Sequence, residues 1–263
     1  MCNSKLKKIY KNPKTIFITG ASSGIGKALA IAYAAPEITL FLCGRNESRL
    51  METANLCKGK GAIAHTFLFD VTNREETENA IKQADAIKPL ELLIANAGVS
   101  GGVLGMPETS DGTHRIIATN VNGVVNTVLP TIAVFKERGC GQIAIIASLA
   151  GYRGMSSCPA YSASKACVKA WGEGLRGLLK KDSIAVNVVC PGFIETPLTD
   201  KNKFKMPFLM QADKAAEIIK RRLTKNSAII AFPHIMAFGA WFGSALPSWI
   251  ILPILGLFPK KES

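Results

Sequence analysis

The sequence Thr15-Ile-Phe-Ile-Thr-Gly-Ala-Ser-Ser-Gly-Ile-Gly26 places a short apolar run directly before three glycines. The apolar run predicts a buried strand, and residues 26–34 predict a helix. Glycines at such a junction allow a tight turn and a close approach of the backbone to a phosphate. The N–H groups at the start of the helix can then hold that phosphate. A plain turn is the alternative, but three glycines at this spacing favour a dinucleotide-binding turn.

The rest of the chain continues this alternation of strands and helices. Further strands are expected near residues 38–43, 62–69, 92–95, 143–147 and 184–189, and further helices near residues 48–58, 74–86, 113–138, 160–180 and 212–223. The strands are almost continuously aliphatic, which is typical of a sheet covered on both faces. Strands that alternate with helices form βαβ units, so we predict an α/β fold with a parallel, doubly wound sheet. The 263 residues contain no repeat or linker and are expected to form a single domain, residues 1–263.

The end of the second expected strand indicates which dinucleotide is preferred. A site for NAD usually carries Asp or Glu there, which binds both ribose hydroxyls. This chain has Gly44-Arg45-Asn46 instead. A guanidinium pairs with a 2′-phosphate that a carboxylate would repel, so we predict a preference for NADP(H), with NAD(H) as the second choice. The alternatives are Glu47 as a ribose ligand and Arg45 as an ordinary surface residue at a helix start.

Tyr161-Ser-Ala-Ser-Lys165 pairs a phenol with an ammonium at positions i and i+4. On a helix both side chains face the same way. A phenol titrates near pH ~10, and a neighbouring ammonium together with an oxidised nicotinamide would lower its pKa toward neutral pH. Ser148 follows the strand expected at residues 143–147, and open α/β sheets place ligands at strand ends. Its hydroxyl would polarise a substrate carbonyl.

Several segments, in their order and spacing, resemble the short-chain dehydrogenase/reductase family over nearly the whole chain. They are residues 19–26, Phe69-Asp-Val71, Asn96-Ala-Gly98, Asn120-Val-Asn-Gly123, Ser148, Tyr161-Ser-Ala-Ser-Lys165 and Pro191-Gly-Phe-Ile-Glu-Thr196. The resemblance implies a Rossmann-type sheet of about seven mostly parallel strands, and a catalytic tetrad. Ala95 departs from the family, where a second Asn often occurs. That Asn braces the sheet, so the departure does not put catalysis in doubt.

The resemblance implies that the catalytic tetrad consists of Asn120, Ser148, Tyr161 and Lys165, and it implies a role for each of them. Tyr161 would donate the proton in reduction and take it in oxidation, while Lys165 would lower its pKa and hold the nicotinamide ribose. Ser148 would orient the carbonyl or alcohol oxygen. Asn120 would support a water that links Lys165 to solvent.

The same resemblance distributes the cofactor contacts along the chain. The residues expected to contact the cofactor are Thr19, Gly20, Ser22, Ser23, Gly24, Ile25, Gly26, Arg45, Asp70, Val71, Asn96, Ala97, Gly98, Tyr161, Lys165, Pro191, Gly192, Ile194 and Thr196. Asp70 would contact the adenine amino group, Asn96 would pass beside the adenosine ribose, and Thr196 would hold the nicotinamide carboxamide.

The net charge and the cysteines indicate which partners and which kinds of site the chain is expected to have. The net charge of +13 favours an anionic partner, which could be anionic lipid, a phosphorylated cofactor or substrate, or nucleic acid; a solvated basic surface is the plain alternative. Nucleic acid is the least favoured, because the lysine-rich residues 5–14 and 201–225 have no recognition helix or stacking aromatic beside them. The seven cysteines form no CxxC pair, which argues against a disulfide framework and a metal site. Residues 1–14 lack the apolar core of a signal peptide, so we expect a cytoplasmic protein.

The segment from residue 228 to residue 258 contains no Lys, Arg, Asp or Glu. Residues 228–232 are expected to form a last strand, and residues 233–258 an apolar C-terminal extension. Prolines and glycines in the extension argue against one straight membrane-spanning helix. It could instead form a wall of the substrate pocket, a subunit interface or a shallow contact with a membrane surface, where tryptophans such as Trp241 and Trp249 concentrate.

Residues 197–211 correspond to a mobile substrate loop of the family. This loop is apolar here, with Phe204, Met206, Pro207, Phe208, Leu209 and Met210. An apolar lid fits an apolar substrate, although a loop packed on its own domain is the alternative. We therefore expect an oxidoreductase that interconverts a ketone and a secondary alcohol on a lipid-like substrate, as a dimer or tetramer. The alternatives are a 3-oxoacyl thioester reductase and a non-catalytic, membrane-associated NADPH-binding module.

Overall fold

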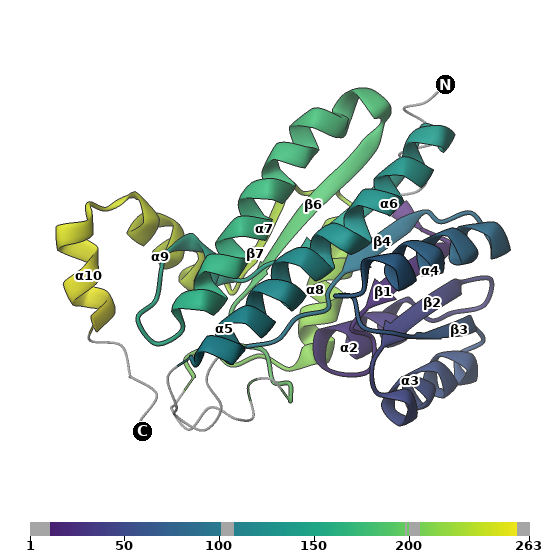
Figure 1. The fold of residues 1–263 in the computed structure, drawn as a ribbon, viewed down its shortest axis with the longest axis horizontal. Coiled ribbons are helices and arrows are strands. Elements are labelled where there is room, and N and C mark those ends of the chain that lie inside the picture. Colours follow the sequence, from purple (N-terminus) through teal and green to yellow (C-terminus); the bar gives the residue numbers. More distant parts are fainter. Residues whose placement is uncertain (1–10, 101–107, 198, 200–205, 257–263) are drawn as a thin grey trace.

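The computed structural model describes residues 11–100, 108–197, 199 and 206–256. A sheet of seven parallel strands runs through the molecule with helices on both sides (Figure 1). The strands are β1 (Thr15–Thr19), β2 (Thr39–Gly44), β3 (Ile63–Leu68), β4 (Leu92–Ala95), β5 (Gly141–Ile146), β6 (Ile184–Pro191) and β7 (Ile229–Phe232). The predicted α/β fold with a parallel sheet is confirmed, and each predicted strand lies at its expected range or overlaps it.

The order of the strands across the sheet is β3-β2-β1-β4-β5-β6-β7. The chain builds one half outward from β1 and then returns to build the other half from β4, which is the doubly wound arrangement. The reversal lies between β1 and β4, where Phe17 is in register with Leu93. Ligands of such sheets bind outside the carboxyl ends of the strands at this reversal. The glycine turn after β1, Asn96 after β4 and Ser148 after β5 therefore share one edge.

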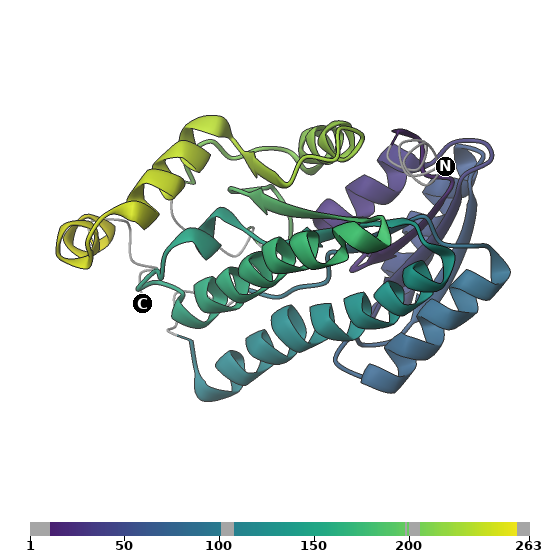
Figure 2. The same ribbon diagram turned by 90° about the horizontal axis from the view of Figure 1, so that it is seen from above.

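Six helices cover the two faces of the sheet (Figure 2). On one face lie α2 (Gly24–Tyr33), α3 (Glu47–Gly59) and α8 (Ala212–Leu223), and on the other lie α4 (Arg74–Ile87), α6 (Gly123–Arg138) and α7 (Pro159–Leu178). The alternation within β1 shows how both faces become buried. Ile16 and Ile18 belong to the apolar cluster of the first face, and Phe17 belongs to that of the second.

The helix predicted for residues 113–138 is longer than expected and is interrupted. It consists of α5 (Ser110–Ile117), a π-helical turn (Ala118–Asn122) and α6. π turns inside helices frequently occur at functional sites, and this turn carries Asn120. In the described part of the chain, Ser110–Arg138 is also the one helix long and apolar enough to cross a membrane, but half of its most apolar window is buried in the protein. Because it packs on the sheet, we interpret it as a core helix.

The C-terminal segment forms the predicted last strand and then two short helices. β7 pairs in parallel with β6, with Ile230 in register with Val189, so the predicted strand is confirmed. The helices α9 (His234–Ala245) and α10 (Ser248–Gly256) extend away from the body of the molecule, at the left of Figure 1. Together these two helices (residues 234–256) form a C-terminal arm that projects from the edge of the sheet.

Candidate active site

The glycine turn joins β1 to α2 in a conformation that favours glycine. Gly20 and Gly24 have φ angles of +65° and +52°, in the left-handed region. A Cβ atom on Gly26 would lie 2.2 Å from the carbonyl oxygen of Gly20, so the strand and the helix approach too closely for a side chain there. An α-helix leaves its first N–H groups without intrahelical partners, so the start of α2 offers donors to an anion. The turn therefore fits the pyrophosphate of a dinucleotide.

Asn96 and Thr19 hold the ends of β4 and β1 together beside this turn. The Thr19 hydroxyl accepts hydrogen bonds from the backbone N–H groups of Asn96 at 3.0 Å and Ala97 at 3.1 Å. The Asn96 side-chain amide donates to the carbonyl oxygens of Thr19 at 3.0 Å and Gly20 at 3.2 Å. The Asn96 side chain thus braces the turn. Its expected place beside the adenosine ribose stays a prediction.

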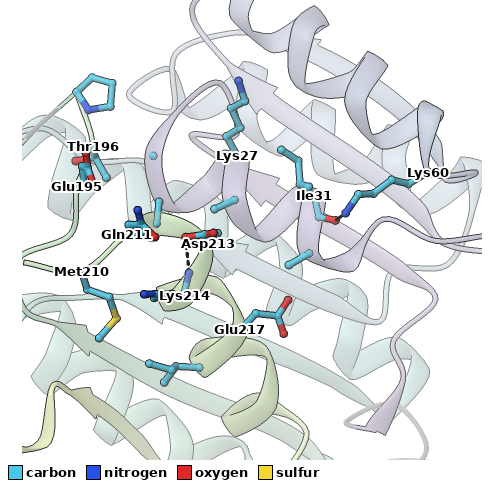
Figure 3. Close-up of a pocket in the computed structure, with 16 residues that line it drawn as sticks. Lys27, Ile31, Lys60, Glu195, Thr196, Met210, Gln211, Asp213, Lys214 and Glu217 are labelled. Atoms are coloured by element: carbon cyan, nitrogen blue, oxygen red, sulfur yellow. Dashed lines mark hydrogen bonds between the residues drawn. The ribbon is translucent and has the colours of Figure 1, made fainter.

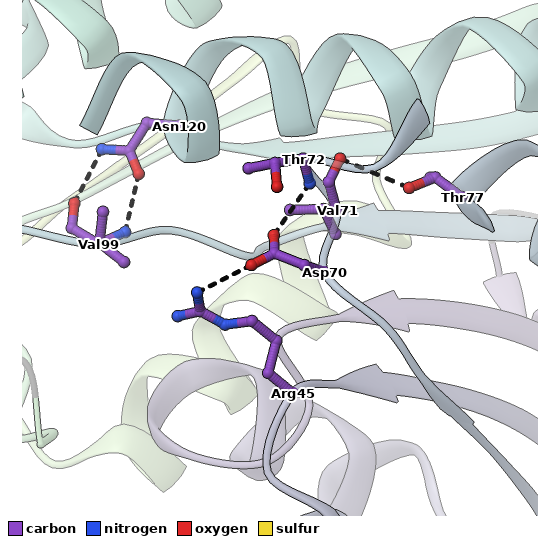
Figure 4. A network of polar contacts seen from close by, with 7 residues as sticks. All are labelled: Arg45, Asp70, Val71, Thr72, Thr77, Val99 and Asn120. Atoms are coloured by element: carbon purple, nitrogen blue, oxygen red, sulfur yellow. Dashed lines mark hydrogen bonds and ion pairs between the residues drawn. The ribbon is translucent and has the colours of Figure 1, made fainter. Parts of the chain in front are cut away.

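Arg45 and Asp70 meet at the ends of β2 and β3 (Figure 4). Nη1 of Arg45 donates to Oδ2 of Asp70 at 2.9 Å. The other carboxylate oxygen accepts from the backbone N–H of Thr72 at 2.9 Å. Burial alone would raise the pKa of Asp70, but these hydrogen bonds from Thr72 and Arg45 hold the pKa below its usual value. Asp70 is therefore a carboxylate at neutral pH, beside the place where the adenine and its ribose are expected.

Ser148, Tyr161 and Lys165 come together at the carboxyl end of β5. The Tyr161 hydroxyl is hydrogen-bonded to the side chain of Ser148. Nζ of Lys165 lies 5.9 Å from the centre of the Tyr161 ring and donates to the carbonyl oxygen of Ile146 at 2.9 Å. Ser148 is itself held in place, since its hydroxyl accepts from the N–H of Ala150 at 3.2 Å. The structure therefore joins the three side chains that were predicted to act together.

Burial shifts the pKa values of the phenol and the ammonium in opposite directions. It raises the pKa of Tyr161 to about 12, although the hydrogen bond with Ser148 acts to lower it. It lowers the pKa of Lys165 to about 8. In the protein without a cofactor the pKa of Tyr161 is therefore raised, because burial disfavours the phenolate. The lowering expected from the ammonium together with an oxidised nicotinamide stays a prediction.

Asn120 connects the π-helical turn to the chain that follows β4 (Figure 4). Its Oδ1 accepts from the N–H of Val99 at 2.8 Å, and its Nδ2 donates to the carbonyl oxygen of Val99 at 2.9 Å and to the Ser164 hydroxyl at 3.0 Å. A Cβ atom on Gly98 would lie 3.2 Å from Oδ1 of Asn120 and 3.4 Å from Nζ of Lys165. Gly98 thus leaves the space between these two groups open. A water linking Lys165 to solvent there stays a prediction.

A family model described as short chain dehydrogenase matches residues 14–206. The chain belongs to the short-chain dehydrogenase family. An uncharacterized oxidoreductase of Myxococcus xanthus is 34% identical over 236 residues, which are 89% of this chain and 93% of that protein. The ketoacyl reductase HetN of a Nostoc species is 34% identical over 199 residues, which are 74% of this chain and 69% of that protein. The crystal structure of an actinorhodin polyketide ketoreductase with NADPH is 25% identical, with a TM-score of 0.74 over 85% of this chain and 97% of that chain.

As a short-chain dehydrogenase, the protein is an oxidoreductase that uses a nicotinamide cofactor and acts on a small molecule. The alternative of a non-catalytic binding module is therefore wrong. The glycine turn fits the cofactor's pyrophosphate, and Lys165 lies beside Tyr161. The contact of these two side chains with the nicotinamide and the substrate stays a prediction.

Glu108 takes part in this short-chain dehydrogenase site, and sequence reasoning missed it. Its carboxylate accepts hydrogen bonds from the N–H groups of Ala160 at 2.5 Å and Tyr161 at 3.1 Å. A negative charge at a helix N-terminus is favourable, so Glu108 stabilises the start of the helix that carries Tyr161 and Lys165. Because it is far from α7 in sequence, it leaves no local capping signal. Cys158 occupies the N-cap position itself.

A cavity of about 970 Å³ lies between α2 and α8 (Figure 3). Gly24 and Thr196, which were both expected to contact the cofactor, line it together with Met210. A Cβ atom on Gly24 would lie 2.9 Å from Cγ2 of Thr196, so the segment after β6 closes onto the glycine turn. None of the described residues that line the cavity is one of the four predicted catalytic residues. The cavity therefore adjoins the glycine turn and the segment after β6, and its described lining does not include Ser148 or Tyr161.

Two apolar segments lie beside the residues after β6 that were expected to contact the cofactor. After β6, Ile194 forms a bridge with Met210, at the end of the predicted substrate loop. The exposed Leu209 precedes it, while Phe204 lies outside the described residues. From α9, the sulfur of Met236 would lie 3.4 Å from a Cβ atom on Gly192. The start of the C-terminal arm therefore contacts the segment that was expected to bind the nicotinamide.

Proposed function

We propose that this short-chain dehydrogenase is NADP(H)-dependent and interconverts a ketone and a secondary alcohol on an apolar, lipid-like substrate. The observation that carries the proposal is the cluster of Ser148, Tyr161 and Lys165 at the same sheet edge as the glycine turn. A phenol hydrogen-bonded to a second hydroxyl offers two groups to one carbonyl oxygen. A buried ammonium beside them can restore the proton that the phenol gives up.

The chain's own residues account for the proton that reduction requires. When bound, a reduced nicotinamide supplies a hydride to the carbonyl carbon. Tyr161 gives its hydroxyl proton to the carbonyl oxygen, and Ser148 holds that oxygen by a hydrogen bond. Lys165, whose pKa burial lowers to about 8, can pass a proton to Tyr161 near neutral pH. In oxidation the same groups act in reverse, with Tyr161 taking the proton of the alcohol.

Arg45 supports the choice of NADP(H). Its side chain is 56% exposed at the end of β2, and one of its nitrogens binds Asp70. A guanidinium has five N–H donors, so Arg45 can bind a 2′-phosphate and keep its contact with Asp70. A Cβ atom on Gly44 would lie 3.2 Å from the Ser22 hydroxyl, which places a second donor at the same strand end. A phosphate bound there would accept from both side chains.

The apolar segments beside the site support a lipid-like substrate. Leu209 and Phe208 are exposed just before Met210, which pairs with Ile194, and Met236 of α9 lies beside Gly192. Such side chains bind hydrocarbon and lose contact with water when a substrate enters. We also propose a homodimer or homotetramer through the helices α5 to α7. Leu129 and Leu178 on α6 and α7 are more than half exposed and are suitable contacts.

A 3-oxoacyl thioester reductase is the second candidate function. The names of two relatives, ketoacyl reductase HetN and actinorhodin polyketide ketoreductase, favour it. The net charge of +13 would also attract an acidic carrier protein that presents such a substrate. The reaction is the same carbonyl reduction by Ser148, Tyr161 and Lys165. The two candidates therefore differ in what delivers the ketone and share the chemistry.

The test is a titration of the purified protein with NADPH and with NADH, followed by fluorescence, and then cofactor consumption on ketones and 3-oxoacyl thioesters of increasing chain length. We expect tighter binding of NADPH and turnover that rises with chain length. Tyr161→Phe should reduce turnover by about 10²–10⁴-fold and leave NADPH binding nearly intact. Arg45→Asp should shift the preference toward NADH and leave turnover with bound cofactor intact. Turnover by Tyr161→Phe at the wild-type rate would disprove the proposed proton transfer.

A further inference from the structure

The C-terminal arm exposes a continuous apolar surface. Its large apolar side chains that are more than half exposed are Ile235, Phe238, Trp241, Phe242, Trp249 and Leu252. Three of them form an aromatic group, in which the ring centre of Phe238 lies 6.0 Å from that of Trp241 and 6.2 Å from that of Phe242. The sequence of the arm contains no Lys, Arg, Asp or Glu. A contiguous surface of this kind is unfavourable in water and marks a contact site.

We propose that this surface docks on the headgroup region of an anionic lipid bilayer, with the arm lying in the plane of the membrane. The arm has two different sides. Met236, Ala237 and Ala240 of α9 pack against the body of the protein, so the aromatic group on the other side points away from it. Crossing a bilayer takes about 20 apolar residues in one helix. α9 has 12 residues and α10 has 9, so each is long enough to lie on the membrane and too short to cross it.

Charge favours a lipid surface over a second copy of this chain. A net charge of +13 attracts the protein to a surface of anionic lipids. Protein interfaces also surround their apolar centre with a polar rim, and the arm supplies no charged side chain for one. Tryptophan is enriched where hydrocarbon meets water, and both Trp241 and Trp249 are among the exposed side chains. A bilayer surface satisfies all three observations.

The two helices of the arm are fixed relative to each other. Arg153 donates to the carbonyl oxygen of Ser244 in α9 at 3.3 Å and to the hydroxyl of Ser248 in α10 at 3.0 Å. The side chain of Ile251 packs against α9 where Gly243 leaves room: a Cβ atom on that glycine would lie 3.3 Å from Ile251. α9 and α10 therefore present their apolar side chains as one surface. Docking needs no rearrangement of the arm.

The position of the arm has a consequence that rests on the proposed function. Arg153 directly follows a short 3₁₀ helix (Leu149–Tyr152) that begins next to Ser148, and Met236 lies beside Gly192. A docked arm would hold this side of the active site against the bilayer. An apolar ketone could then pass from the membrane to Ser148 and Tyr161 without crossing bulk water. Docking itself depends on the surface of the arm alone.

The test is co-sedimentation of the full chain with vesicles of phosphatidylcholine, with and without phosphatidylglycerol, at low and high salt. We expect binding that needs the anionic lipid, weakens with salt and shifts the tryptophan emission to the blue. Phe238→Ser combined with Trp249→Ser should weaken binding by at least about tenfold. The matched control is Ile63→Ser combined with Ile87→Ser, which removes two exposed apolar side chains elsewhere on the protein and should bind within about twofold of the wild type.

Light scattering and enzyme assays distinguish membrane docking from a subunit interface and from a failure of the proposed function. If light scattering shows that the arm variant turns a lipid-free oligomer into a monomer, and vesicles do not sediment the wild type, the arm is a subunit interface and the proposal is wrong. Equal binding by the arm variant and the control also overturns it. NADPH binding and reduction of a water-soluble ketone should be unchanged in the arm variant, which verifies its fold. Vesicle binding without reductase activity in the wild type would disprove the proposed function and leave the docking intact.

Discussion

α2 and α9 are both short apolar helices, and the fold covers them very differently. In α2 the residues Leu29, Ala30 and Tyr33 are buried between the sheet and α8. In the slightly longer α9, Gly243 is the one buried residue. The reason is topological: α2 follows β1, which has strands on both sides, whereas α9 follows β7, which ends the sheet. The apolar composition of a helix shows that it must pack against other residues. The position of the strand before it in the sheet decides whether the same chain supplies those residues.

The largest difference between α2 and α9 is expected when one glycine in each helix is replaced by alanine. In Gly26→Ala, the new Cβ would lie 2.2 Å from the backbone oxygen of Gly20, which cannot move without opening the turn. A displacement of about 1 Å can cost about 100-fold at a reacting site, so we expect NADPH binding to fall by at least about that factor. In Gly239→Ala, the new atom would meet no described atom within 4 Å. That variant should keep its NADPH affinity and gain up to about 1 kcal/mol in free energy of unfolding.

Fluorescence titration with NADPH, and urea unfolding of both variants, measure these effects. Normal NADPH affinity in Gly26→Ala would show that the close contact between β1 and α2 is not required for the cofactor. A stability loss in Gly239→Ala would show that α9 is packed against something on its outer side.

A smaller effect is expected when one large side chain in each helix is shortened. Leu29 in α2 is fully buried, so Leu29→Ala should lower the free energy of unfolding by about 2–5 kcal/mol. Phe238 in α9 is 64% exposed, so Phe238→Ala should change it by no more than about 0.5 kcal/mol. Urea unfolding at two protein concentrations provides the measurement. If Phe238→Ala lowers the free energy of unfolding strongly and in a way that depends on protein concentration, a second copy packs against the arm in solution. The contrast drawn between α2 and α9 would then be wrong.

The sequence predicted those parts of the site that have a local pattern. The glycine turn follows a strand, Ser148 follows another, and Tyr161 and Lys165 stand one helical turn apart, so each could be located without the fold. Three features could not be predicted. Glu108 reaches the start of α7 from a distant part of the chain. The π-helical turn has no known compositional signal. The direction of the Tyr161 pKa shift depends on burial, which follows from tertiary packing.

The C-terminal arm was the most ambiguous part of the sequence for the same reason. The lack of charge from residue 228 to residue 258 fits a pocket wall, a subunit contact and a membrane contact equally well. In the structure, different residues of this segment face different surroundings. Met236 lies beside Gly192 at the site, whereas Phe238 and Trp249 face away from the protein. Only the exposed fraction of each side chain separates these roles, and the composition does not contain it.

The smallest expected effect is a change of the free energy of unfolding with pH. It should come from the active site, which buries the Lys165 ammonium, and not from the arm, which contains no lysine. Lys165 is 4% exposed, and burial lowers its pKa to about 8, against about 10.4 in an unfolded chain. Between these values the unfolded chain retains a proton that the folded protein has released. The free energy of unfolding contributed by Lys165 must therefore rise with pH across this window and stay constant below it. Tyr161 acts in the opposite direction, but only above pH 10, since burial raises its pKa from 10.0 to about 12.

Urea unfolding of the wild type and of Lys165→Met from pH 7 to pH 9.5 isolates this contribution, because Tyr161 is common to both. We expect the wild type to gain about 1–3 kcal/mol relative to Lys165→Met over that range. The difference between the wild type and Phe238→Ala should stay constant with pH, because that substitution lies in a segment without Lys, Arg, Asp or Glu. A pH-independent difference for Lys165→Met would mean that the ammonium is solvated in the free enzyme. Lys165 would then keep an ordinary pKa, and its proposed return of a proton to Tyr161 near neutral pH would lose its physical basis.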